Sequence, residues 1–259
     1  EMRDQNGLVR ESTKWDYELR YPEQTANLVD RGVTISMSAP RGPVYLGLPR
    51  EPLAEAWPED LPIDGPMQSI PTAASPNPDA IQQAAALISK AKNPLIICQR
   101  SDPEGTLGCA LLRFIESQAI PVAEPFAIQN VLATGHPMHG GFNLDPWLEN
   151  ADVVLSIDAP VPWIPRNQKL TEGAEVIHIG VDPLFSGLPM RSYQNDLSIT
   201  SDPALALNAL NAALKSFAGG NTERYKIIQS KNKKRREGIL KKAKSGNNSP
   251  MTPLYVGHC

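Results

Sequence analysis

A charged turn follows a short apolar run near the middle of the chain. The run is Leu95–Cys98, and the turn after it, Gln99–Gly105, reads QRSDPEG. Dinucleotide-binding folds place glycines in such a turn, because phosphates must approach its backbone amides closely. Here the single glycine comes last, Asp102 and Glu104 would repel phosphate, and Arg100 would attract it. We therefore expect a nucleotide-type fold without a nucleotide; an FAD- or ADP-binding module with Arg100 as a contact is the alternative.

Two histidines, His136 and His139, have the spacing of metal ligands on one helical turn. Gly135, Pro137 and the pair Gly140-Gly141 disfavour a helix around them, because both residue types weaken helices. A zinc site also needs further Cys, His or acidic ligands, and none adjoins this pair. The sequence therefore predicts no metal site here.

An aromatic side chain, Trp163, stands in a proline-rich segment after another apolar run, Val153–Ile157. The segment at 159–165 reads APVPWIP, and prolines on both sides of Trp163 would hold the indole rigidly. Ligands of open parallel sheets bind beyond the carboxyl ends of the strands. Trp163 is thus a candidate for the wall of a substrate channel. Packing at a domain interface, which we favour, is the alternative.

Five short apolar runs are candidate strands. Runs that are apolar on both sides are typical of parallel sheets covered on both faces. Because helical segments alternate with them, we expect an α/β fold, a Rossmann-like doubly wound parallel sheet with right-handed crossovers. The candidate strands are Leu95–Cys98, Pro121–Ala123, Val153–Ile157, Val176–Ile179 and Leu197–Ile199.

The same helix-start signal occurs five times. An Asn or Asp side chain can accept hydrogen bonds from the free amides of a first turn, and a proline in the next position has no amide to leave unpaired. Each such pair predicts the beginning of a helix. The pairs are Asn77-Pro78, Asp102-Pro103, Asp145-Pro146, Asp182-Pro183 and Asp202-Pro203.

The region before the sheet predicts the tail of a truncated α/β domain. A strand is expected at Val44–Leu48, and a helix from Pro22 with one apolar face formed by Ala26, Val29, Val33 and Met37. A proline-rich connector without periodicity follows, as is usual between domains. We divide the chain into that tail (1–52), a linker (53–76), the central Rossmann-like domain (77–218) and a basic helix with a linker into a further domain (219–259).

Composition narrows the classes of partner. The chain has 259 residues, 41% of them hydrophobic, and a formal net charge of −3, which gives no overall attraction to nucleic acid or anionic membranes. Its three cysteines lack metal-ligand spacing and predict reduced thiols of a cytoplasmic protein. There is neither a signal peptide nor an apolar run as long as a membrane span. We expect no nucleic-acid partner and no membrane partner.

A basic run at 223–244 holds ten Lys or Arg residues against two Glu. Such a run could bind nucleic acid, but Tyr225 is its only aromatic residue. We expect a solvated helix that carries the chain toward the next domain.

Taken together, the motifs resemble the acetolactate synthase and benzoylformate decarboxylase type of thiamine diphosphate-dependent enzyme. The resemblance covers the end of the pyrimidine-binding domain, the central domain and the opening of the diphosphate-binding domain. It rests on Ser12-Thr13-Lys14-Trp15, Arg41–Pro49, Asn93–Ile97, Ile120-Pro121-Val122, Gly135–Gly141, Ala151–Leu155, Ile177–Pro183 and Ser249–Pro253.

This resemblance implies a parent enzyme, a lyase or transferase, that acts on a 2-oxo acid with thiamine diphosphate and Mg²⁺ and assembles as a homodimer or homotetramer. It also implies that the activating glutamate lies before Glu1 and the magnesium motif after Cys259, so that this chain holds no catalytic or metal-binding residue and is inactive alone. Lys14 aligns with a lysine that lies near the substrate entrance in synthase relatives; a solvated lysine before a truncated helix is an equal alternative. His139 and Gly140 lie in the loop that approaches FAD in flavin-binding relatives, although FAD is not expected here.

Overall fold

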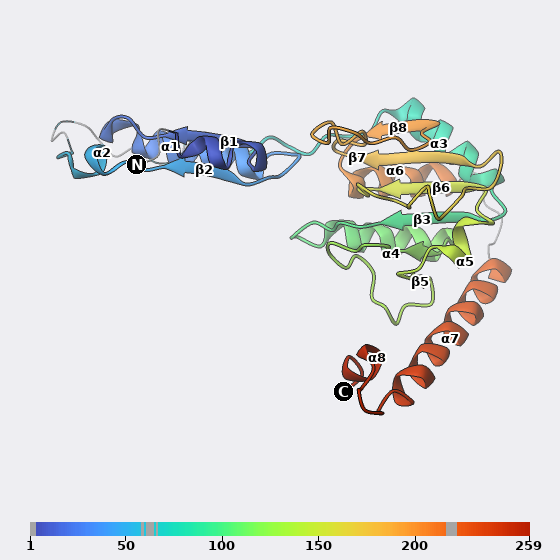
Figure 1. Cartoon of the computed structure of the whole chain (residues 1–259). Helices are drawn as coiled ribbons and strands as arrows, with labels where there is room; N and C mark the ends of the chain where they lie inside the picture. Colours follow the sequence, from blue (N-terminus) through green and yellow to red (C-terminus); the bar gives the residue numbers. More distant parts are fainter. Residues whose placement is uncertain (1–3, 58–59, 61–64, 66, 216–221) are drawn as a thin grey trace. The chain divides into compact units, whose positions relative to one another are not determined.

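The computed structural model describes residues 4–57, 60, 65, 67–215 and 222–259. The chain forms two compact units, Glu1–Ala73 and Ala74–Cys259 (Figure 1). Within the described residues, none of the helices combines the length and the apolar character that crossing a membrane requires.

The first unit is a two-stranded parallel sheet with one long helix against it. Strands β1 (Trp15–Glu18) and β2 (Val44–Gly47) pair along their whole length, and α1 (Thr25–Met37) supplies the crossover that parallel neighbours need. The strand predicted at Val44 is confirmed, whereas β1 is too short and too mixed in polarity to be predicted. Shorter elements are η1 (Asn6–Leu8), η2 (Arg10–Ser12), η3 (Pro22–Gln24) and α2 (Arg50–Ala54).

Helix α1 is confirmed, but its predicted buried face is wrong. Leu28 and Gly32 face the strands, while Val29 and Val33 are 45% and 53% exposed. Gly32 explains the choice of face: a Cβ atom there would lie 3.5 Å from Leu46, so the helix backbone runs close to the sheet at this point.

The second unit contains a six-stranded sheet in which all strands are parallel, in the order β5-β4-β3-β6-β7-β8. The predicted Rossmann-like α/β fold and all five candidate strands are confirmed; only β5 was not predicted. The central strands β3 and β6 are buried along their full length, as their apolar composition requires. The strands are β3 (Pro94–Cys98), β4 (Val122–Ala123), β5 (His139–Gly141), β6 (Val153–Ile157), β7 (Glu175–Gly180) and β8 (Leu197–Thr200).

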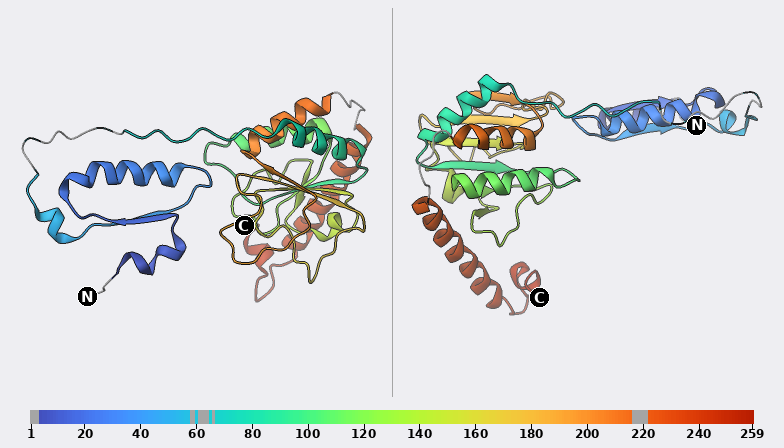
Figure 2. Two further views of the ribbon diagram at one scale, coloured as in Figure 1. Left: turned by 90° about the horizontal axis from the view of Figure 1, so that it is seen from above. Right: turned by 180° about the vertical axis from the view of Figure 1, so that it is seen from behind.

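Three helices cover one face of this sheet: α3 (Pro78–Lys90), α4 (Thr106–Gln118) and α6 (Pro203–Leu214) (Figure 2). Loops and the short α5 (Asp145–Leu148) cover the other face. Among the described residues, the largest fully buried side chain, Phe114, projects from α4.

The helix-start signal is confirmed at α3, α5 and α6 and wrong at Asp102 and Asp182. Helix α4 begins at Thr106, and the Asp102 carboxylate accepts hydrogen bonds from the Thr106 and Leu107 amides, both at 2.7 Å. The Asp182 carboxylate accepts the Ser186 amide at 2.7 Å and closes a turn without a helix. An Asp-Pro pair therefore marks a capped turn, which a helix does not always follow.

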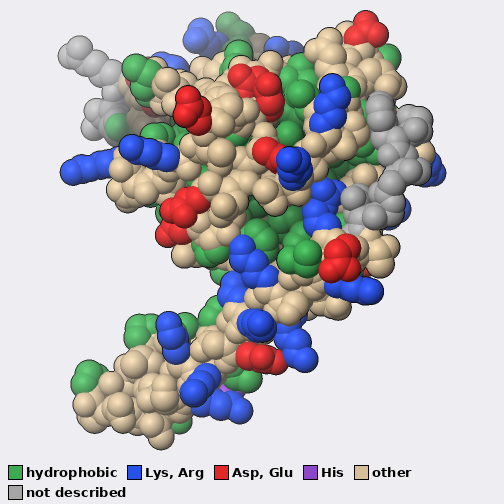
Figure 3. Space-filling model, turned by 90° about the vertical axis from the view of Figure 1, so that its right-hand side faces the viewer, with side chains coloured by type: hydrophobic (Ala, Val, Ile, Leu, Met, Phe, Trp, Pro, Cys, Tyr) green, Lys and Arg blue, Asp and Glu red, His purple; other side chains and the backbone are tan. Residues whose placement is uncertain are grey.

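The basic run forms α7 (Thr222–Lys244), followed by α8 (Pro253–Val256). The helix itself is confirmed, but the prediction that it is solvated holds for its outer side only. Figure 3 shows Lys and Arg side chains along α7, and the exposed ones include Lys226 and Lys233. On its inner side, Lys231 Nζ lies 3.9 Å from the Trp147 ring centroid, and Asn232 donates a hydrogen bond to the Pro137 carbonyl at 2.8 Å.

Arg224, in the first turn of α7, holds the ends of two other helices. Its guanidinium donates to the carbonyls of Ala91 at 3.1 Å, Gln118 at 2.7 Å and Ala119 at 3.1 Å, which lie at the carboxyl ends of α3 and α4. Carbonyls at the carboxyl end of a helix have no partner within the helix, and a cation there also interacts favourably with the negative end of the helix dipole.

We expect Arg224→Ala to lower the free energy of unfolding by about 2 kcal/mol, since three carbonyls lose a charged donor. Urea denaturation followed by tryptophan fluorescence measures the change. Lys226→Ala, two residues along α7 and exposed, is the control and should stay within about 0.5 kcal/mol of the parent chain. Equal free energies of unfolding for the two variants would contradict the stabilising role assigned to Arg224.

Candidate functional site

Open parallel sheets bind ligands where the chain changes direction, and we call that region of the six-stranded sheet the crevice. Strands β3 and β6 are neighbours, but the chain leaves β3 toward β4 and leaves β6 toward β7 on the opposite side. At such a point two loops diverge and open a crevice at the carboxyl ends of the strands. Cys98 pairs with Ile157 at those ends, so the next residues, Gln99, Arg100 and Asp158, form the floor of the crevice.

Gln99 ties the loops around the crevice together. Its buried side chain donates to the carbonyls of Pro125 at 2.6 Å and Val161 at 2.7 Å, and it accepts the Val161 amide at 3.2 Å. Because both amide hydrogens are donated within the protein and the oxygen already accepts one hydrogen bond, the Gln99 side chain positions the loops. The sequence analysis did not identify this role.

Two arginines lie against Phe185 beside the crevice. The Arg100 guanidinium carbon is 5.7 Å from the Phe185 ring centroid, and that of Arg191 is 4.8 Å from it. Arg191 also donates to the carbonyls of Ala159 at 3.1 Å and Pro160 at 3.0 Å. Arg191 therefore holds the loop after β6 by hydrogen bonds. Arg100 lies just beyond the carboxyl end of β3, and its role as a cofactor contact stays a prediction.

Carboxylates share this crevice with the arginines. Burial raises the pKa of the Asp158 carboxyl, the positive charge of Arg100 opposes that rise, and the charge of Asp182 adds to it. Asp158 has φ of 40°, a left-handed conformation that is unusual for a residue other than glycine. Acidic side chains at the floor oppose the binding of a diphosphate, in agreement with the expectation from the turn sequence.

Trp163 lies in the interior of the second unit. It is 4% exposed, and its ring meets that of Tyr193 edge to face, with 5.1 Å between the centroids. This contact joins the loop after β6 to the loop after β7, both within the second unit, so the packing at a domain interface that we favoured stays a prediction. A place for Trp163 in a substrate channel also stays a prediction.

His139 and Gly140 lie on the edge strand β5, two strands away from Arg100 in the sheet order. Both ring nitrogens of His139 are buried, and neither has a hydrogen-bond partner within the described part of the chain. Its Nε2 is 3.8 Å from Glu124 Oε1, which is too far for a hydrogen bond. Burial, reinforced by the charges of Arg235 and Arg236, lowers the pKa of His139 to about 4, so this imidazole is neutral at pH 7.

Two side chains donate hydrogen bonds to backbone carbonyls of β5. Trp147 Nε1 donates to the Gly140 carbonyl at 3.0 Å, and from α7 Arg235 donates to the His139 carbonyl at 2.9 Å. The structure thus brings His139 and Gly140 together with Glu124, Trp147 and Arg235, but not with Arg100. Their role as cofactor contacts stays a prediction.

Lys14 belongs to the first unit and closes the end of α1. Its ammonium donates to the carbonyls of Ile35 at 2.8 Å and Ser38 at 2.7 Å, and to Ser38 Oγ at 2.7 Å. A lysine is a favourable partner for carbonyls at a helix carboxyl end. The proposed place near a substrate entrance is not tested by these contacts and stays a prediction. Among the described residues, we find no cluster of three or more His, Cys, Asp or Glu that could hold a metal ion.

Comparison with known proteins gives the same family from sequence and from structure. Residues 81–210 match the family described as "Thiamine pyrophosphate enzyme, central domain". Oxalyl-CoA decarboxylase of Escherichia coli (strain K12) is 28% identical over 222 residues, which cover 82% of this chain and 38% of that protein. A probable acetolactate synthase of Mycobacterium bovis is 29% identical over 139 residues, which cover 54% of this chain and 25% of that protein.

Among solved structures, benzoylformate decarboxylase from Polynucleobacter necessarius matches with a TM-score of 0.65 and 27% identity, over 78% of this chain and 38% of that one. The chain therefore spans well under half the length of these relatives. The family match extends over half of the chain and falls on the six-stranded sheet and its helices. The chain belongs to the thiamine pyrophosphate enzyme family, and residues 81–210 of its second unit match the central domain of that family.

Proposed function

We propose that this chain is part of an enzyme that uses thiamine diphosphate, the same compound as thiamine pyrophosphate, with Mg²⁺ to decarboxylate or join 2-oxo acids. The observation that carries the proposal is the match of residues 81–210 to the family's central domain. The names of the relatives, two decarboxylases and an acetolactate synthase, support a lyase or a transferase.

The described residues do not fit a diphosphate and its metal ion. They contain no cluster of acidic, His or Cys ligands suited to a cation, and Asp158 and Asp182 approach the crevice at the switch point. Thiamine diphosphate supplies carbanion stabilisation where it is bound. We propose that it is bound outside the described residues and that this chain alone is inactive.

The proposed contribution of this chain is structural. The central domain would hold the cofactor-binding domains at their working separation, with Lys14 and Trp163 along the substrate channel. The domain limits proposed are those of the sequence analysis, with the central domain at 77–218. We further propose that the full-length parent enzyme is cytoplasmic and assembles as a homodimer or homotetramer.

An FAD- or ADP-binding module, with Arg100, His139 and Gly140 as contacts, is not favoured. Arg100 lies at the carboxyl end of β3 near Asp158, and the negative charges of Asp158 and Asp182 would oppose a diphosphate there.

The longer polypeptide encoded around this sequence provides the test. With thiamine diphosphate and Mg²⁺ it should release CO₂ from at least one of pyruvate, benzoylformate and oxalyl-CoA, whereas the 259-residue chain under the same conditions should not. Saturable quenching of FAD fluorescence by the 259-residue chain would instead support the nucleotide module. Absence of cofactor-dependent CO₂ release from the longer polypeptide would overturn the proposal.

A further inference from the structure

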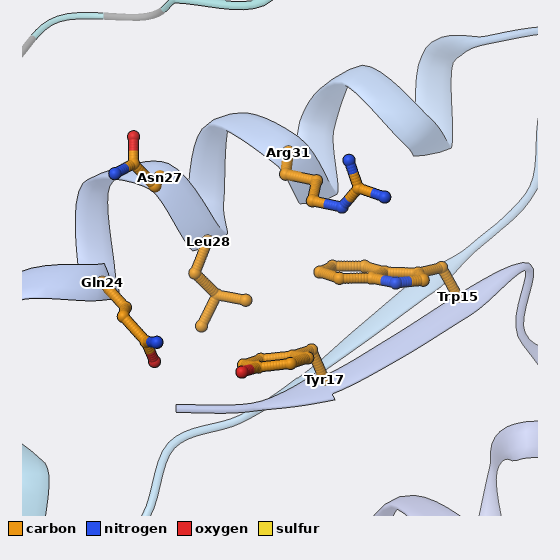
Figure 4. A pocket seen from close by; sticks show the side chains of 6 residues that line it. All are labelled: Trp15, Tyr17, Gln24, Asn27, Leu28 and Arg31. Atoms are coloured by element: carbon orange, nitrogen blue, oxygen red, sulfur yellow. The ribbon is translucent and has the colours of Figure 1, made fainter. Parts of the chain in front are cut away.

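The groove between α1 and β1 in the first unit is closed by its own side chains (Figure 4). The Arg31 guanidinium carbon lies 5.6 Å from the Trp15 ring centroid, and the Trp15 and Tyr17 rings stack with 5.9 Å between their centroids. Leu28, which is buried, completes the contact between helix and strand. This groove is therefore packing within the first unit and leaves no space for a ligand ring between Arg31 and Trp15.

An apolar rim lies at the carboxyl ends of the strands in the second unit. Because all six strands are parallel, the loops that follow them lie at one edge of the sheet. Large hydrophobic side chains on the loops after β4, β6 and β7 are between 37% and 84% exposed. Single exposed apolar side chains are ordinary, but a group of them marks an interaction surface. The rim consists of Phe126, Ile128, Val161, Ile164, Leu184, Leu188 and Met190.

Hydrogen bonds from Gln99 hold the loop after β4 against the loop after β6. Its side-chain nitrogen donates to the carbonyls of Pro125 and Val161, at 2.6 Å and 2.7 Å. The Gln99 carbonyl accepts the Ile128 amide at 2.8 Å. Phe126 follows Pro125 directly, so the apolar side chains of these two loops are neighbours.

Arg191 and Trp163 join the loop after β6 to the loop after β7. Arg191 donates to the Pro160 carbonyl at 3.0 Å and to the Pro183 carbonyl at 3.4 Å. The Trp163 ring meets that of Tyr193 with 5.1 Å between the centroids. The three loops therefore form one continuous surface.

The backbone of these loops is held in an unusual conformation. Four described residues other than glycine have positive φ, and three of them lie in the loops of the rim: Asp158 at 40°, Phe126 at 50° and Phe185 at 52°. Side chains disfavour this left-handed conformation, which persists only where the surroundings fix it and is common at binding surfaces. Phe126 is thus held in place while its side chain is 60% exposed.

The area and the charges of the rim suit a second copy of this chain. Its side chains present roughly 700 Å² of apolar surface, taking about 180 Å² for each when fully exposed. That area approaches the roughly 800 Å² that each partner buries in a stable interface. Within the rim, Arg100 lies close to Asp158 and Asp182. Two copies related by a twofold axis can therefore place opposite charges against each other.

We propose that two copies of this chain associate face to face through the apolar rim. The inference goes beyond the proposed function, because it assigns a self-association surface to the 259-residue chain itself. Its test measures association and not CO₂ release, so that either proposal can fail while the other stands.

Sedimentation equilibrium of the 259-residue chain tests the proposal. We expect a dimer with Kd of about 10 µM or tighter, at the weak end for an interface of this area. Met190→Asp should weaken association at least about tenfold, because it puts an unpaired charge into the interface. Met251→Asp, the same substitution at an exposed methionine outside the rim, should leave Kd within about twofold.

A second variant and a second measurement keep the test valid should Met190→Asp alter the fold. Phe126→Asn removes apolar surface and suits the left-handed backbone, because asparagine adopts that conformation more readily; it should also weaken association at least about tenfold. In the unaltered chain, amide hydrogen exchange at 126–131, 160–164 and 184–190 should be slower in the dimer than in the diluted monomer. A chain that is monomeric at about 100 µM, equal effects of the two methionine variants, or unchanged exchange at the rim would overturn the proposal.

Discussion

Gly140→Ala lowers the free energy of unfolding of the second unit by about 3 kcal/mol, a large change for a single added methyl group. A Cβ atom at Gly140 would lie 2.9 Å from Trp147 Nε1 and 3.0 Å from the Val122 carbonyl oxygen. Neither neighbour can retreat cheaply: the carbonyl belongs to β4, and the Trp147 ring is packed under Lys231. Strand β5 must therefore shift away from β4.

Gly135→Ala, in the loop that precedes β5, is the matched control. No atom lies within 4 Å of a Cβ built at Gly135, so the methyl group meets open space. Its free energy of unfolding should equal that of the parent chain or exceed it slightly, since alanine restricts the unfolded chain more than glycine does. Chemical denaturation followed by circular dichroism compares the two variants. If Gly140→Ala loses no more free energy of unfolding than Gly135→Ala, the methyl group is accommodated beside β5 and the predicted clash is wrong.

Acidification should destabilise the second unit through His139. Its pKa in the folded chain is about 4, below the ordinary 6.5, because burial disfavours the charged ring. A group whose folded pKa is lowered in this way binds protons more readily when unfolded. The contribution of His139 to the free energy of unfolding is therefore complete above pH 6.5 and is lost as the pH falls toward 4. The difference between the two pKa values corresponds to a loss of about 3 kcal/mol.

The neighbouring carboxyl acts in the opposite direction. Burial raises the pKa of Glu124, so its contribution is present at low pH and is lost as the pH rises above its ordinary value of 4.5. The variant His139→Phe isolates the histidine, because phenylalanine fills the space without titrating. Between pH 6.5 and 4.5 the free energy of unfolding of the unaltered chain should fall more steeply than that of His139→Phe. Parallel curves would contradict the assignment of the acid sensitivity to His139.

The sheet was predictable where strands are apolar throughout. The runs at β3 and β6 lie in the centre and are buried along their length, which is why composition alone locates them. Strand β5 reads His-Gly-Gly and has no strand propensity; it exists because β4 and α7 flank it. The buried face of α1 was mistaken because the packing position is a glycine, which an apolar pattern does not count.

The candidate site was predictable only in part, for a similar reason. Arg100 follows a recognisable strand, so its position at the switch point could be inferred. Phe185 and Arg191, which lie against each other beside it, come from a distant loop and carry no local signal. The inner side of α7 does have a local sequence signal. Its residues recur at helical spacing and could have indicated a packed face: Arg224, Ile228, Lys231 and Arg235.

The position of α7 along β5 bears on how the chain behaves at high concentration. An outer strand with open backbone groups invites a strand of another molecule to join it, and repetition of that step leads to fibrils. Here Arg235 of α7 already donates a hydrogen bond to the His139 carbonyl, and the helix occupies space that an incoming strand would need. Shortened versions ending before Thr222 would therefore be exposed to self-association at this end of the sheet, and a soluble product should retain the helix.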